Sequence, residues 1–349
     1  MITHIHVSGF KSIDDLHLDV HPCTVLVGRS GTGKTHLLEA VTLVKRTLEA
    51  GFRNAMQETG SHFNQATLFH RTGGVPAELL SVRVELTVPF AESYVPLAVQ
   101  LVAHRTADGD LALRREYSNI SVREGADTAV TALMGTADLD DPDQCTTLAE
   151  LAWSALKGFD VDATDPDLPG TESALAEMYL RLSLLERSEL SAHVAALVSG
   201  GRRVRLVTIG SEHRFDVEVA DVGWLPLSSL SRFERVAVSA LLVALADHVV
   251  CVDDLGAGAP RDLADDLFRR LRDLCAPGQV LAVSAAPGIA GLARLGASGL
   301  VYFQTATRAG GGRPFARSVV ARPVRERGPD EDLDCAASFR SVERAMGSR

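Results

Sequence analysis

The sequence predicts an α/β fold with a mixed central sheet, an antiparallel β-subdomain and a short helical insertion. Three observations lead to this prediction. An apolar strand at residues 24–27 runs through a glycine-rich loop into a helical pattern. Residues 81–118 are β-rich, with polar and apolar side chains alternating as in antiparallel strands. Residues 203–283 alternate between strand and helix patterns, which is typical of parallel strands joined by helices.

The N-terminal elements follow in order. Residues 3–8 and 15–20 alternate around a Gly-Phe-Lys-Ser turn and predict a pair of strands. The buried strand at 24–27 comes next, and the helical spacing begins after the glycine loop, at residues 36–41. Two further strands flank the turn at residues 107–110.

Residues 138–202 change character and predict the helical insertion. Helical stretches at 146–157 and 171–199 are separated by the acidic, proline-containing segment 160–169. The insertion shows no sustained heptads, so a long coiled coil is not expected.

The C-terminal half completes the alternation. Strands are predicted at 204–209, 215–219, 249–252 and 279–283, and helices at 231–246 and 261–274. After Phe303 the chain becomes rich in Gly and Arg. The predicted organisation is an N-terminal lobe at 1–137, the insertion at 138–202, a C-terminal lobe at 203–327 and a weakly ordered tail at 328–349.

Composition narrows the function classes. With 349 residues, 46% of them hydrophobic, the chain can build a sizeable core. A formal net charge of −10 argues against a dedicated DNA-binding module. The five cysteines show no CxxC spacing, which favours a reducing compartment without structural zinc. No secretion signal or apolar run of about 20 residues is visible, so we expect a cytoplasmic protein with no membrane segment.

The loop that follows the strand at 24–27 has the P-loop pattern, Gly-x4-Gly-Lys-Thr. In such a loop backbone N–H groups turn toward phosphate, the lysine neutralises β/γ oxygens and the hydroxyl binds magnesium. The predicted nucleotide-binding residues are Gly28, Ser30, Gly31, Thr32, Gly33, Lys34 and Thr35, with Thr35 also a Mg²⁺ ligand. The alternative is a chance glycine turn, which the strand-loop-helix context disfavours.

A P-loop needs a second carboxylate on the magnesium side, at the end of a neighbouring buried strand. Asp253 and Asp254 follow the apolar strand at 249–252. We expect Asp253 to hold Mg²⁺ through water and Asp254 to lie where the attacking water is polarised. The alternative is that both cap the helix after Pro260, although a cap should stand immediately before its helix.

Four segments carry a resemblance to a known family: residues 2–13 (ITHIHVSGFKSI), the P-loop, Leu38-Glu39-Ala40-Val41 and the late Asp253-Asp254. They resemble the SMC/RecF-like branch of ABC-type ATPases, among the AAA family ATP-binding proteins. The order of these motifs matches over most of the chain. The resemblance implies a P-loop NTPase with an ABC ATPase-like head, in which the two lobes carry the P-loop and the signature and Walker B motifs. The short insertion speaks against a long-armed SMC protein.

The family's signature, Ser-Gly-Gly or Ser-Ser-Gly, corresponds to residues 227–235, where the glycine is missing. In ATP-sandwich dimers this motif presents a helix N-terminus to the γ-phosphate bound by the opposite subunit. Ser228, Ser229 or Ser231 can still donate, and Ser229 and Ser231 are the candidate ligands. The equally weighted alternative is a serine-rich N-cap for the helix at 231–246.

Two further positions depart from the family. Asp254 stands where the resemblance places a glutamate, so its carboxylate is withdrawn by one methylene. Ala285 stands where it places a switch histidine, and a methyl group cannot form a hydrogen bond. These departures imply slow or partner-dependent hydrolysis. Gln65 is the weak candidate for the family's Q-loop ligand, with an ordinary loop amide as the alternative.

The leading functional hypothesis is an ATP- and Mg²⁺-dependent dimerisation switch. By resemblance, its contexts are DNA repair, chromosome maintenance and anti-phage defence. The alternative is an ATP-binding scaffold or sensor with little hydrolysis that regulates a partner effector. A P-loop kinase or GTPase is a third possibility, which the late Walker B strand and the lack of Asn-Lys-x-Asp disfavour.

Two surface features are weaker. Arginines cluster at residues 202–205 and again at Arg308, Arg313, Arg317, Arg322, Arg325 and Arg327. They can contact DNA phosphates, but a solvated charged face is the preferred interpretation. His4 and His6 share one face of a strand and can in principle share a metal, but no third ligand is evident nearby, so a polar strand face is preferred.

Overall fold

The computed structural model describes residues 1–29, 31–58, 68–72, 75–90, 93–105, 111–119, 142–159, 164, 171–210, 212–256, 258–284, 298–308 and 316–323. The chain forms two compact units. The first unit contains Met1–His21, Ser30–Lys157 and Phe303–Arg322. The second unit contains Pro22–Arg29, Gly158–Tyr302 and Pro323–Arg349.

An antiparallel sheet forms the body of the first unit, with strand order β2-β1-β6-β7-β8. These strands are β1 (Ile2–Phe10), β2 (Ile13–Asp19), β6 (Leu79–Phe90), β7 (Ser93–Arg105) and β8 (Leu111–Asn119). Burial alternates along β1, where Ile5 and Val7 are fully buried while His4 and His6 are partly exposed. The period-2 pattern therefore gives this hairpin one core face and one polar face.

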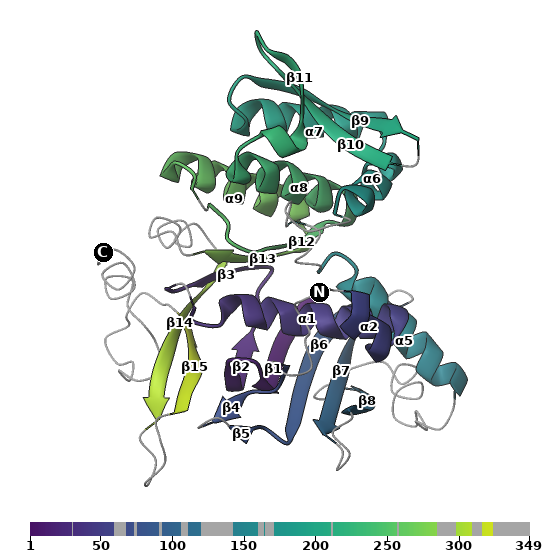
Figure 1. The fold of residues 1–349 in the computed structure, drawn as a ribbon. Coiled ribbons are helices and arrows are strands. Elements are labelled where there is room, and N and C mark those ends of the chain that lie inside the picture. Colours follow the sequence, from purple (N-terminus) through teal and green to yellow (C-terminus); the bar gives the residue numbers. More distant parts are fainter. Residues whose placement is uncertain are drawn as a thin grey trace. The chain divides into compact units, whose positions relative to one another are not determined.

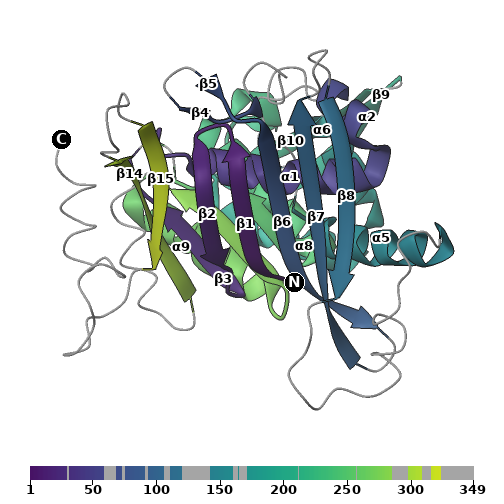
Figure 2. The same cartoon turned by 90° about the horizontal axis from the view of Figure 1, so that it is seen from below.

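Helix α1 (Lys34–Ala50) packs on this sheet against β1, β6 and β7. Its apolar residues, such as Leu37, Leu38 and Val41, recur at helical spacing and are buried. Helices α2 (Phe52–Glu58) and α5 (Pro142–Leu156) lie beside α1, all on one side of the sheet in Figure 2. A short antiparallel pair, β4 (Arg71–Thr72) and β5 (Val75–Pro76), precedes β6 along the chain.

A second sheet contains β3, β12 and β13 of the second unit together with β14 and β15, most of whose residues belong to the first unit. Its strand order is β12-β13-β3-β14-β15, and β12, β13, β3 and β14 are mutually parallel. The bounds are β3 (Cys23–Val27), β12 (Val249–Val252), β13 (Gln279–Ser284), β14 (Ser298–Arg308) and β15 (Ala316–Pro323). Every residue of β3 and β13 is buried, as expected of near-continuous apolar strands in a parallel sheet.

Helices α8 (Arg232–Asp247) and α9 (Arg261–Cys275) pack against each other and against β12 in the second unit (Figure 1). Helices α6 (Thr171–Arg181) and α7 (Leu184–Leu197) pack on α8. A small antiparallel sheet of β9 (Gly201–Ile209), β10 (Glu212–Val219) and β11 (Gly223–Pro226) adjoins α6 and α7. Leu241, Phe268 and Phe215 are fully buried in the core that these layers share.

The predicted mixed α/β class is confirmed, and so are the predicted strand at 24–27, the antiparallel strands in 81–118 and the α/β alternation after residue 203. The helices expected in the insertion exist, but they are divided between units: α5 belongs to the first, and α6 and α7 belong to the second. Strands β14 and β15 were not predicted. The turn at 107–110 and the tail at 328–349 lie outside the described residues. Across the part of the chain that the structure describes, no helix has the length and apolarity to cross a membrane.

Candidate functional site

The glycine loop connects the buried strand β3 to the amino end of α1. Gly31 and Gly33 have φ angles of 80° and 87°, in the left-handed region that L side chains rarely adopt. Gly33 is the N-cap of α1. Glycine has no side chain that could accept a hydrogen bond from the backbone N–H groups of the first turn. The positive end of the helix dipole therefore faces the loop without a side-chain cap. This is the backbone arrangement that binds phosphate.

Lys34 is the first residue of α1 and is 6% exposed. Its Nζ lies 3.4 Å from Oγ1 of Thr32, which is itself 7% exposed. The ammonium is therefore held back toward the loop, where it can meet an anion at the helix terminus. Thr35, the predicted Mg²⁺ ligand, is exposed in the first turn. Ser30 lies outside the described residues.

The β1–β2 turn holds the start of α1 in place. Lys11 has a φ of 47°, and its Nζ forms a buried ion pair with Oε2 of Glu39 at 2.7 Å. Ser12 Oγ lies 2.6 Å from Nδ1 of His36. Burial lowers the pKa of His36, an effect that Glu39 opposes and Lys11 reinforces. The neutral ring can then accept the hydrogen bond of the Ser12 hydroxyl.

These two contacts were not predicted, although the sequence carried a signal for them. The Gly-Phe-Lys-Ser turn and the Leu-Glu-Ala-Val segment were recognised separately as family-like. The structure brings Lys11 of the first to Glu39 of the second. The turn therefore positions the helix that follows the P-loop.

The parallel sheet brings the end of β12 and the start of the glycine loop to one side of the sheet. Val252 pairs with Ala282, and Ala282 pairs with Val25, so β12 ends two residues before β13 and β3 at the same, carboxyl side of the sheet. Asp253 follows β12 directly, and Gly28 follows β3 directly. With one strand between them, these two chain segments are about 10 Å apart. Asp253 and Gly28 thus share the sheet edge at which α/β proteins bind ligands.

Asp254 occupies a turn with a φ of 61°, which aspartate tolerates better than most residues. Two hydrogen bonds tie the turn to the end of β13: Leu255 N–H donates to Val283 O at 2.7 Å, and Ser284 Oγ donates to Leu255 O at 2.9 Å. Helix α9 begins at Arg261 with Pro260 as its N-cap. The alternative in which the two aspartates cap this helix is therefore wrong.

The signature-like serines have two different environments. Ser228 and Ser229 lie exposed in a 3-10 turn, Leu227–Ser229. Ser231 is the N-cap of α8 and forms a complete capping box with Glu234: its Oγ accepts from Glu234 N–H at 3.3 Å, and its N–H donates to Glu234 Oε2 at 3.0 Å. The N-cap interpretation therefore describes Ser231. Ser229 and Ser231 as γ-phosphate ligands remain a prediction.

Other predicted residues fall into two groups. Gln65 and Ala285 lie outside the described residues. The arginines of β9 form ion pairs with the neighbouring strand β10, Arg203 with Glu218 at 3.1 Å and Arg205 with Asp216 at 2.9 Å. Arg203 and Arg205 therefore pair with carboxylates of the same sheet. This agrees with the interpretation of the arginine cluster as a solvated charged face.

Comparisons with known proteins agree with this architecture. No protein-family model and no curated protein matches the chain. Among solved structures, it is similar to an SMC head bound to the C-terminal winged-helix domain of ScpA, with a TM-score of 0.61 and 12% identity, over 92% of this chain and 98% of that one.

Two archaeal structures are also similar. An SMC head domain with a coiled coil and joint from Pyrococcus yayanosii has a TM-score of 0.57 and 11% identity, over 99% of both chains. An SMC head with an extended coiled coil from Pyrococcus furiosus, bound to the C-terminal domain of ScpA, has a TM-score of 0.53 and 14% identity, over 92% of this chain and 96% of that one. The chain therefore has the fold of these SMC head domains.

Proposed function

We propose that the chain binds ATP and Mg²⁺ through its P-loop and acts as a nucleotide-driven dimerisation switch. The observation that carries the proposal is the amino end of α1. Two glycines with left-handed backbone lead into it, the N-cap has no side chain, and Lys34 is held beside it. A helix amino end with a lysine beside it favours the binding of a nucleotide's phosphates.

The residues fit a magnesium nucleotide. Mg²⁺ prefers oxygen ligands, and the Thr35 hydroxyl and the Asp253 carboxylate offer them. Gly28, Ser30, Gly31, Thr32, Gly33 and Lys34 bind the phosphates, and Gln65 is a weaker candidate near the γ-phosphate. Bound Mg²⁺ neutralises charge on the phosphate oxygens. Asp254 orients and polarises the attacking water.

The proposed dimerisation involves the amino end of helix α8. In the proposed closed state, Ser229 and Ser231 at the start of α8 approach the γ-phosphate held by the other copy. Since two of the similar SMC heads carry a bound domain of ScpA, a protein partner that responds to closure is part of the proposal. DNA repair, chromosome maintenance or anti-phage defence in the cytoplasm are the proposed contexts.

The second candidate is an ATP-binding scaffold or sensor with little hydrolysis. It is favoured by Asp254, whose shorter side chain starts from a constrained turn with a φ of 61°. The two functions differ in whether phosphate is released after ATP has bound.

Single-turnover hydrolysis separates them. For the switch, we expect slow phosphate release that Asp254→Asn reduces at least tenfold, because the amide cannot accept the proton of the attacking water. Asparagine also tolerates the left-handed turn, so the fold should be kept. The matched control is Asp262→Asn, at an exposed position on α9, which should hydrolyse ATP at the wild-type rate. No release from the wild type would favour the scaffold.

Light scattering tests dimerisation directly. With ATP and Mg²⁺ the molar mass of Asp254→Asn should double, and the mass of Lys34→Ala should stay that of the monomer. A nucleotide-independent mass for Asp254→Asn would contradict the switch.

A further inference from the structure

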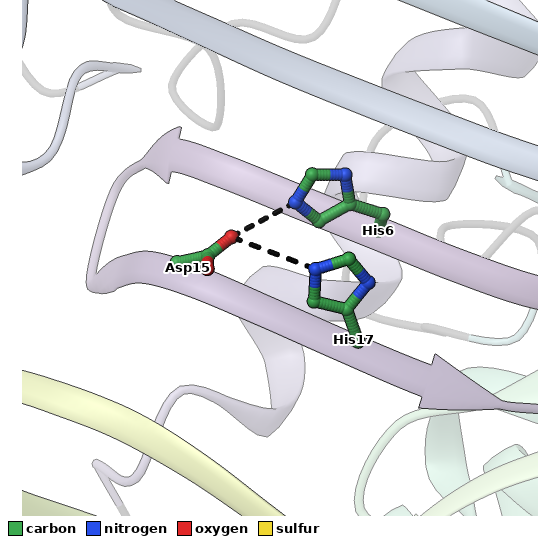
Figure 3. Close-up of side chains that lie close together, drawn as sticks. All are labelled: His6, Asp15 and His17. Atoms are coloured by element: carbon green, nitrogen blue, oxygen red, sulfur yellow. Dashed lines mark hydrogen bonds and ion pairs between the residues drawn. The ribbon is translucent and has the colours of Figure 1, made fainter.

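A cluster of histidines and aspartates covers the polar face of the β1–β2 hairpin, and no step of the proposed function uses it. The antiparallel register pairs His6 with His17, Ser8 with Asp15 and His4 with Asp19. Because these residues stand directly opposite one another and recur at every second position of each strand, their side chains leave the sheet on the same side. Figure 3 shows His6 and His17 both directed toward Asp15.

His6, Asp15 and His17 converge on one point. His6 Nε2 lies 2.8 Å from Asp15 Oδ1, and His17 Nε2 lies 4.0 Å from the same oxygen. One ligand atom from each of the three residues lies within 4.8 Å of the others. Tetrahedral zinc with bonds of about 2.0–2.1 Å requires ligand atoms roughly 3.3 Å apart. Closing the site therefore requires side-chain rotations on this polar face of the hairpin.

A chain of hydrogen bonds orients His17 for this role. His17 Nδ1 lies 3.3 Å from His4 Nε2, and His4 Nδ1 lies 2.8 Å from Asp19 Oδ1. When His4 is neutral and donates from Nδ1 to Asp19, its Nε2 can accept from His17 Nδ1. In the neutral ring, His17 Nε2 then carries a lone pair on the side of Asp15. A histidine that binds a metal usually donates its other ring N–H to a neighbouring acceptor, which orients the ring. Here His4, itself bonded to Asp19, would be that neighbour for His17.

The surrounding charges favour a cation. Asp15 and Asp19 lie on β2, and the neighbouring strand β6 contributes Arg83 and Glu85, which pair with each other at 3.0 Å. The one arginine is therefore offset by its own carboxylate, and the two aspartates remain. His6 and His17 are stacked, with ring centroids 3.9 Å apart, so one must turn out of the stack for both nitrogens to face one ion.

We propose that His6, His17 and Asp15 bind a divalent transition-metal ion of the zinc type, with water completing the coordination. Imidazole nitrogen and carboxylate oxygen in a two-to-one ratio suit Zn²⁺ and, as a spectroscopic substitute, Co²⁺. The ion would link β1 to the edge strand β2. It therefore binds independently of ATP, and its failure or success leaves the P-loop proposal untouched.

The test is titration of the tag-free, chelator-treated full chain with ZnCl₂ by calorimetry and with CoCl₂ by visible absorption. We expect one ion per chain in the wild type, visible Co²⁺ bands, and affinity at least tenfold weaker in His6→Gln and in His17→Gln. The control is His213→Gln, which alters a histidine of β10 in the second unit and should bind like the wild type.

Asp15→Asn keeps the proposal testable if a histidine variant unfolds, because Asp15 is largely exposed. It should also lose at least tenfold in Zn²⁺ affinity while keeping the wild-type circular dichroism spectrum. Equal Zn²⁺ affinity in the wild type and in folded His17→Gln or Asp15→Asn would overturn the proposal, as would the absence of binding to the wild type.

Discussion

Helices α1 and α8 begin in opposite ways, although both are proposed to meet the same phosphate chain. At α1 the N-cap is Gly33, which has no side chain, and the first residue is a buried lysine. At α8 the N-cap is Ser231, whose capping box with Glu234 satisfies backbone N–H groups from within the chain. The Glu234 carboxylate also adds a negative charge to the positive end of the helix.

The amino end of α8, the closed end, has a carboxylate of its own chain, Glu234, beside its first turn, whereas at the amino end of α1, the open end, the N-cap makes no side-chain hydrogen bond. Lys34 lies beside Thr32 at this end of α1. The end of α8 is stable by itself, so a phosphate that approaches it must share donors with Glu234 or displace it. If the proposed function is right, this difference predicts a chain that binds ATP more readily than it closes around it.

The largest expected effect comes from removing the glycine at the open end. Gly33→Ala introduces a side chain at a φ of 87°, which costs about 1–2 kcal/mol of unfolding free energy. It should also abolish the stabilisation by ATP, because the added methyl group forces a change in the loop backbone that is proposed to bind the phosphates. Urea unfolding with and without ATP and Mg²⁺ measures both quantities.

Gly51 offers a matched control at the other end of α1. It has a φ of 82°, and a Cβ there would have no heavy atom within 4 Å. Gly51→Ala should therefore lose stability through backbone strain and still be stabilised by ATP. Loss of the ATP effect in both variants would mean that strain in α1, and not the open terminus, controls binding.

A smaller effect is expected at the closed end. Ser231→Ala removes the cap of α8 and should lower the unfolding free energy by about 1 kcal/mol. Ser183→Ala removes an equivalent capping box, with Glu186, at the start of α7 and should cost about the same. If Ser231 also contacts the partner's γ-phosphate, only Ser231→Ala should weaken ATP-driven dimerisation, by roughly tenfold or more. Equal dimerisation of the two variants in light scattering would restrict Ser231 to capping.

The smallest effect concerns the charge in a capping box. The backbone N–H and the hydroxyl of Ser183 hold the pKa of Glu186 below its usual value of 4.5. A lowered folded-state pKa contributes stability above the unfolded value and loses it as pH falls through the folded value. Wild type should therefore exceed Glu186→Gln in stability at pH 7, and the difference should shrink below about pH 4.5.

Urea melts of both proteins between pH 7 and pH 3 check this expectation. Glu177→Gln, at an exposed position on α6, is the control and should show no such trend. A difference between wild type and Glu186→Gln that grows toward acid pH would contradict the stated direction.

The sequence predicted the parts of the fold that local pattern determines. The strand at 24–27 and the glycine loop are contiguous, so their order alone placed Lys34 at a helix start. Strand β14 was missed because its partner is β3, more than 270 residues away, where Tyr302 pairs with Val27. The Lys11–Glu39 pair was missed for the same reason, since it joins a turn to a helix 28 residues later.

The metal cluster shows the same limit at shorter range. His4 and His6 were recognised as sharing a strand face, and the neighbouring strand was predicted, but no third ligand was identified. Asp15 and His17 join them only through the register that pairs His6 with His17. A register shift of one residue would move both side chains to the other face.

The central claim is that the open end of α1 binds ATP, and thermal unfolding with ATP and Mg²⁺ tests it most directly. At a ligand concentration one hundredfold above the dissociation constant, binding should stabilise the wild type by about 2.7 kcal/mol. Lys45→Ala removes the same charge from the same helix about three turns away and should keep the shift. Lys34→Ala should show none. Equal shifts in wild type and Lys34→Ala would contradict the account.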